Sequence, residues 1–158
     1  MTDRRQRCDS IEGQKQAMQN ALAGPIEPPK HVRLRDSDRP FWDAIIGARA
    51  RDKWDAADLA HAANLARCQA DIEDMQTRLE AEGHVIENAR GTMVANPRHS
   101  ILETLSRRAV YLSKLLHVHP EAKQGEAKDQ GKALNAQRKA GQVSQDADDD
   151  LMPGLGTH

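Results

Sequence analysis

The sequence predicts a mainly α-helical protein built around an antiparallel hairpin of two long helices, with a small β-hairpin at its tip. Apolar residues recur at alternating steps of three and four in two segments, 55–82 and 97–117, which is the spacing of a heptad seam. Aromatic residues make up only 3% of the chain and charged residues 30%. Burial must therefore come largely from helices packing on one another.

Residues 1–53 are expected to hold a basic arm and two short helices. Ser10 can cap a helix that ends near Ala23, before a glycine and a proline. The following stretch GPIEPP (24–29) should be extended, because a proline disfavours helix at the residue before it. A second helix should cover 38–50 and bury an apolar face that includes Trp42.

Residues 54–119 are expected to form the helical-hairpin core. Asp55 can cap a long helix that ends at Gly83, and Asn96-Pro97 can open a second helix that runs to about residue 117. Two short apolar segments around the turn NARG predict a β-hairpin over 84–95. Two helices of similar length joined by so short a link should fold back antiparallel.

The apolar positions of the two seams are expected to supply both the core and contacts between copies of the chain. Ile101 and Leu115 widen the second stripe beyond what one partner helix covers. This spare apolar surface predicts a closed homo-oligomer larger than a tetramer. The predicted core and oligomer residues are Leu65, Ile72, Met75, Leu79, Ile101, Leu105, Leu112 and Leu115.

The apolar pattern stops after Pro120. Residues 120–158 include the acidic run DADDD (146–150) and few large apolar side chains. Such a segment buries too little surface to offset the entropy of ordering it. It is therefore predicted to be a disordered acidic tail, with room for nascent helix near 126–139.

Positive charge is concentrated before residue 54. Residues 1–53 carry 11 Lys and Arg against 8 Asp and Glu, whereas 54–119 carry 7 against 9 and 120–158 carry 5 against 7. In a monomer this surplus is an ordinary solvated surface, but repetition around a ring makes it a surface for DNA phosphates. The candidate DNA-binding residues are Arg4, Arg5, Arg7, Lys30, Arg33, Arg35, Arg39, Arg49, Arg51 and Lys53.

The sequence contains no motif for catalysis or nucleotide binding. The patterns GxxxxGK[ST], GxGxxG and GxSxG are absent, and no His or Cys residues stand at metal-ligand spacing. We therefore expect no catalytic residue, metal or cofactor. Two isolated cysteines and the absence of a long apolar stretch predict a cytosolic protein that does not cross a membrane.

Several short motifs follow one another in a recognisable order. GPIEPP precedes Phe41-Trp42, a DxAxL helix start stands at 55–59, a long helix ends in Glu82-Gly83, and Asn96-Pro97 opens a Leu-rich helix. In this order and spacing, residues 41–122 resemble the small terminase subunits of tailed phages. HVHP (117–120) stands where these relatives have GLxP, and this departure puts the end of the last helix in question.

The resemblance implies a non-catalytic subunit of a ring-shaped homo-oligomer. Such a subunit binds the packaging initiation site of double-stranded phage DNA in the host cytoplasm, outside the virion. It passes the DNA to a large terminase subunit that carries the ATPase and nuclease. The residues alone leave two alternatives open: a dimeric helical transcription regulator that binds DNA, and a coiled-coil adaptor that binds none.

Overall fold

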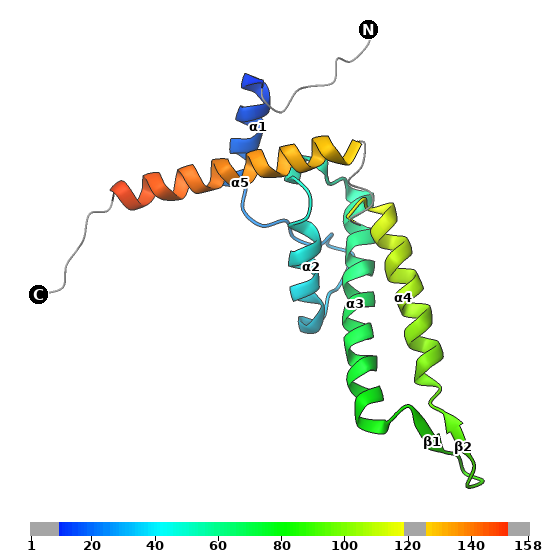
Figure 1. Ribbon diagram of the computed structural model, residues 1–158. Helices are drawn as coiled ribbons and strands as arrows, with labels where there is room; N and C mark the ends of the chain where they lie inside the picture. The colour runs from blue at the N-terminus through cyan, green and yellow to red at the C-terminus, as the bar shows by residue number, and fades with distance from the viewer. Residues whose placement is uncertain (1–9, 119–125, 152–158) are drawn as a thin grey trace, which may run out of the picture.

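The computed structural model describes residues 10–118 and 126–151, without the side chains of 126–130 and 147–151. Within this part, α3 and α4 form a long antiparallel pair with a β-hairpin beyond one end (Figure 1). Helix α2 packs beside α3, and α1 and α5 pack on each other near the opposite end. No helix in these described residues is long and apolar enough to span a membrane.

The N-terminal helices begin where the sequence predicts. Helix α1 spans Ile11–Leu22, and the Ser10 Oγ accepts a hydrogen bond of 3.1 Å from the Gly13 N–H. A 3₁₀ turn, η1 (Asp36–Asp38), leads into α2 (Arg39–Ile46). The prediction that this second helix continues to residue 50 is wrong. The chain leaves the helix at Gly47, turns Arg49 inward and forms a further 3₁₀ turn, η2 (Arg51–Lys53).

The predicted helical hairpin is confirmed. Helix α3 spans Ala56–Glu82, and the Asp55 carboxylate caps it by accepting from the Asp58 N–H at 2.7 Å. Gly83 ends α3 with φ +86°, a backbone angle that favours glycine. Helix α4 spans Arg98–Leu115, and the Asn96 Oδ1 accepts from the Arg98 N–H at 3.0 Å.

The β-hairpin between these helices is also confirmed. Strand β1 (Val85–Glu87) pairs antiparallel with β2 (Met93–Ala95), with Val85 opposite Ala95. Gly91 supplies the positive φ that the turn needs. The hairpin extends beyond the ends of α3 and α4, where none of the helices α1, α2 and α5 reaches it (Figure 1).

The core lies in the half of the α3–α4 pair that α2 covers. Its buried members are Trp42, Ile45, Ala62, Ala63, Leu65, Ala66, Leu112 and Leu116. Of the predicted seam residues, Leu65, Leu79 and Leu112 are buried, whereas Ile72, Met75 and Leu105 are half-buried. Ile101 and Leu115 keep 49% and 43% of their surface exposed. The packing of α4 on α3 leaves Ile101 and Leu115 uncovered. This exposed apolar surface agrees with the width of the apolar stripe in the sequence.

The structure corrects the prediction of a disordered tail. Residues Glu126–Leu151 form the helix α5, which packs across α1 and faces Ala21 with Gly141 (Figure 1). Small residues let two helices approach closely without a stripe of large apolar side chains. A reading based on large apolar residues therefore misses this contact. Residues 120–125 and 152–158 of the predicted tail lie outside the described residues.

An ion pair ties α3 to α4 at the β-hairpin end. The Glu82 carboxylate accepts from the Arg98 Nε and Nη2, each at 2.7 Å, and from the Asn96 Nδ2 at 3.1 Å. Hydrogen bonds from Arg98 and Asn96 lower the pKa of Glu82 from 4.5 to about 2. Because the folded pKa is depressed, this contribution to stability is full above pH 4.5 and is lost as the pH falls towards 2.

We therefore expect Glu82→Gln to remove part of the acid sensitivity of the fold. The unfolding midpoint in urea should fall less for this variant than for the parent between pH 4.5 and 2. Glu80→Gln removes a carboxylate from the same last turn of α3 and serves as the control. Identical pH profiles for Glu82→Gln and the parent would contradict the role given to this pair.

Candidate nucleic-acid interface

The linker between α1 and α2 presents basic side chains to solvent. Within residues 30–35, Val32 and Leu34 pack against the core, which leaves Lys30, Arg33 and Arg35 exposed. The Arg67 Nη2 donates a hydrogen bond to the Arg33 carbonyl oxygen and so ties the linker to α3. The alternation of apolar and basic residues thus produces a basic strip on a fixed backbone.

Arg35 helps to fix the position of this strip. Its Nη2 donates to the Asp38 Oδ1 and to the Asp71 Oδ1, each at 2.7 Å. Burial raises the pKa of the Asp38 carboxyl, but hydrogen bonds from Arg35 outweigh it and the pKa lies below its ordinary value. The same bonds raise the pKa of Arg35. Two carboxylates thus already match the charge of Arg35, which leaves little surplus for a phosphate.

Arg39 stands at the start of α2 beside the linker. Its Nη1 lies 3.3 Å from the Glu27 Oε2, and about half of its side chain is exposed. An ion pair this open to solvent contributes little to stability. Its guanidinium can therefore exchange a carboxylate for a phosphate at small cost.

The apolar face of α2 is buried, as the sequence predicts. Trp42 is fully covered, and its Nε1 donates to the Ile26 carbonyl oxygen at 3.1 Å. The exposed positions of α2 are Arg39, Pro40, Asp43 and Ala44. Only Arg39 among these four can donate to a base edge or a phosphate, so α2 is poorly suited to reading DNA sequence. Its buried face, through Trp42, instead anchors the linker.

The structure removes Arg49 from the candidate DNA contacts. Only 9% of its surface is exposed. The Nη1 donates to the Asp58 Oδ2 at 2.9 Å and to the Leu116 carbonyl oxygen at 3.1 Å, and the Nη2 donates to the Lys53 carbonyl oxygen. Its guanidinium carbon lies 4.5 Å from the centre of the Trp54 ring. Arg49 therefore joins elements of the fold and is not an exposed contact on the outer surface of the protein.

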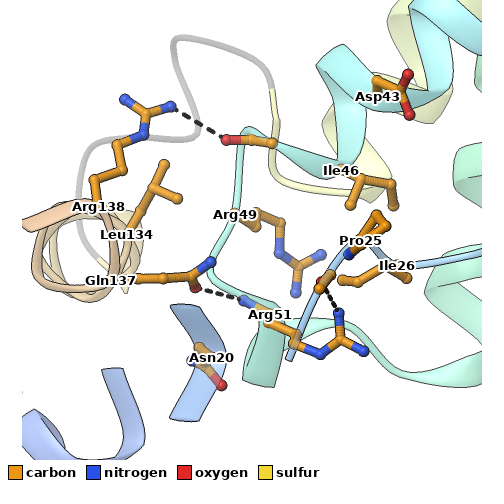
Figure 2. A pocket seen from close by; sticks show the side chains of 12 residues that line it. Asn20, Pro25, Ile26, Asp43, Ile46, Arg49, Arg51, Leu134, Gln137 and Arg138 are labelled. Carbon is orange, nitrogen blue, oxygen red and sulfur yellow. Dashed lines mark hydrogen bonds between the residues drawn. The ribbon is translucent and has the colours of Figure 1, made fainter. Parts of the chain in front are cut away.

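The remaining predicted basic residues differ in their surroundings. The Lys53 Nζ lies 2.8 Å from the Asp52 Oδ2, so a neighbour matches its charge. The Arg51 Nη1 donates to the Gly24 carbonyl oxygen at 2.8 Å, and Arg51 lines a cavity between α1, α2 and α5 (Figure 2). Arg4, Arg5 and Arg7 lie outside the described residues.

A second surface of interest is apolar and lies on α4. Ile101, Tyr111 and Leu115 share one side of this helix, and 49%, 66% and 43% of their surfaces are exposed. Val110, which is 47% exposed, stands on the opposite side, because nine residues turn a helix by roughly two and a half turns. Sequence reasoning identified Ile101 and Leu115 but missed Tyr111, because tyrosine does not stand at a seam position.

The described residues contain no group of three or more His, Cys, Asp or Glu side chains placed to hold a metal ion. His84 and His99 form a close pair at the base of the β-hairpin, with the His84 Nδ1 3.2 Å from the His99 Nε2. Both side chains are exposed.

Comparison with known proteins identifies the family of this chain. The model of the Hendrixvirinae small terminase family matches residues 1–158, which is the whole chain. The chain is also 35% identical over 156 residues to the terminase small subunit of Enterobacteria phage HK97, with 96% of each protein covered. On these two matches, the chain belongs to the Hendrixvirinae small terminase family.

Proposed function

We propose that this small terminase subunit assembles into a closed ring larger than a tetramer and binds the packaging initiation site of the phage DNA. Membership of the family makes it a non-catalytic subunit with a role in phage DNA packaging. The proposal adds that, in the host cytoplasm, the ring delivers the DNA to the large terminase subunit. The observation that supports it most is that the linker and the start of α2 present a basic surface, while α4 presents a separate apolar one.

The apolar stripe of α4, defined as Ile101, Tyr111 and Leu115, is the proposed subunit contact. Its residues flank the seam that packs on α3, so a neighbouring copy would extend the same core. Helix α2 packs on α3 and leaves this side of α4 uncovered, so a neighbouring copy has apolar surface to bury there. In a closed ring every copy can bury its stripe against a neighbouring copy, so no stripe is left exposed to solvent.

The proposed DNA surface consists of Lys30, Arg33 and Arg39, with Arg35 holding the linker in place. These three cations are exposed and lie on a segment that α2 and α3 keep fixed. Contacts of this kind neutralise phosphates and carry little sequence information. One subunit would bind weakly, and repetition around a ring would strengthen binding. The basic arm with Arg4, Arg5 and Arg7 remains a predicted addition to this surface.

The assembly proposal is tested by placing a charge in the stripe. We expect Ile101→Asp with Leu115→Asp to dissociate the ring, because an unpaired carboxylate is costly to bury. Native mass spectrometry at micromolar concentration should give a species larger than a tetramer for the parent and smaller species for this variant. Val110→Asp, on the opposite side of α4, should retain the parent's mass. A parent that is a monomer or dimer would refute the ring and favour a dimeric regulator or an adaptor.

The DNA proposal is tested by reversing charge at constant assembly. We expect Lys30→Glu, Arg33→Glu and Arg39→Glu together to weaken binding to packaging-site DNA and to reduce the salt dependence of the binding constant. The variant with Arg90→Glu, Arg107→Glu and Lys114→Glu has the same change in net charge at exposed positions elsewhere. Fluorescence anisotropy across a salt series measures both variants. Equal loss in the two variants would show that net charge, and not these linker cations, determines the binding, and would refute the proposed surface.

A further inference from the structure

A cavity of about 440 Å³ lies between α1, the linker, α2 and α5 (Figure 2). This volume falls in the range of small-molecule sites in proteins. Its walls come from segments far apart in the sequence, so it exists only because α5 packs back on the N-terminal half of the chain. Neither the proposed DNA surface nor the stripe of α4 uses this cavity.

Three guanidinium groups from separate segments line the cavity: Arg49 after α2, Arg51 in η2 and Arg138 in α5. The Arg51 Nη1 donates to the Gly24 carbonyl oxygen at 2.8 Å, and the Arg138 Nη2 donates to the Gly47 carbonyl oxygen at 3.3 Å. Neither residue forms an ion pair with a carboxylate whose side chain the structure describes. In Figure 2 their guanidinium groups lie on opposite sides of Arg49.

Arg49 adds a buried donor that lacks an acceptor. The side chain is more than nine-tenths buried, and its Nε has no hydrogen-bond partner among the described residues. Its Nη1 and Nη2 have acceptors that belong to the fold. The Nε itself is closed to solvent, so Arg49 contributes positive charge to the cavity wall and not a hydrogen bond from this atom.

The rest of the lining supplies few acceptors for these donors. Asp43 is the one carboxylate in the lining, and it points away from the guanidinium groups (Figure 2). The Gln137 Oε1 already accepts from the Arg51 backbone N–H at 3.0 Å, which leaves the amide nitrogen of Gln137 as a further donor. The rest of the lining is largely apolar, with Ile26 and Ile46 on one side and Leu134 on α5 beside Arg138 (Figure 2). A ligand of this cavity must therefore be an anion with several acceptor oxygens.

We infer that this cavity binds a phosphate group. A phosphate offers acceptor oxygens in several directions, which matches the donors of Arg51, Gln137 and Arg138 on two separate segments, beside the charge of Arg49, better than the two oxygens of a carboxylate do. The source is either a free phosphate compound, whose remaining atoms the apolar wall can cover, or the backbone of DNA. Because Arg138 lies on α5 and the other two arginines on the body, the bound group links α5 to the rest of the fold.

The test uses the full chain and two probes, inorganic phosphate and adenosine monophosphate, with chloride at the same ionic strength as the reference. Isothermal titration calorimetry should show saturable binding of at least one probe to the parent. Arg138→Gln and Arg51→Gln should each weaken it about tenfold or more, since a charged hydrogen bond is lost. Arg90→Gln, in the β-hairpin turn at the other end of the molecule, should bind as the parent does.

Arg138 is exposed, so the fold should tolerate its substitution, and circular dichroism checks this before the titration. Absence of saturable binding to the parent, or parental affinity in a folded Arg138→Gln variant, would overturn the inference. A competing DNA duplex then identifies the source of the phosphate. Displacement of the probe assigns the site to DNA, and undisturbed binding assigns it to a free phosphate compound. The charge-reversed linker variant should bind the probes normally, so this inference and the DNA proposal can fail separately.

Discussion

The buried guanidinium of Arg49 is the contact on which the arrangement of the other elements depends. It joins the turn after α2 to the start of α3 through Asp58 and to the end of α4 through the Leu116 carbonyl oxygen. The Trp54 ring covers one face of the group. A charge placed this deep is stable only because its partners are held around it, so the same cluster fixes where three helix ends meet.

The position of both proposed surfaces follows from this junction. With the ends of α3 and α4 joined there, α2 and the linker lie against one half of the hairpin and bring their exposed cations onto a fixed backbone. Helix α2 packs on α3, which leaves the apolar stripe of α4 exposed. Basic residues close in sequence thus have different roles: Arg49 holds the fold, Arg35 positions the linker, and Arg33 faces solvent.

The sequence predicts the hairpin well because its signals are local and redundant. The heptad spacing, the Asp55 cap and the glycine at 83 each indicate the same helix, and α3 has those bounds. Two features are beyond such reasoning. The helix α5 packs through small residues such as Gly141, which produce no apolar pattern. Arg49 looks like a solvent-exposed cation in sequence, because its partners lie nine and 67 residues away along the chain.

The most direct test of this account is a double-mutant cycle on Arg49 and Asp58, with the free energy of unfolding measured for each variant. Arg49→Met should destabilise the protein by about 3 kcal/mol, because it leaves Asp58 and the Leu116 carbonyl oxygen without their donor. Asp58→Asn should then cost much less in the Arg49→Met background than in the parent. A change below about 0.5 kcal/mol for Arg49→Met, together with weakened DNA binding, would contradict the account, because that is how an exposed phosphate contact behaves.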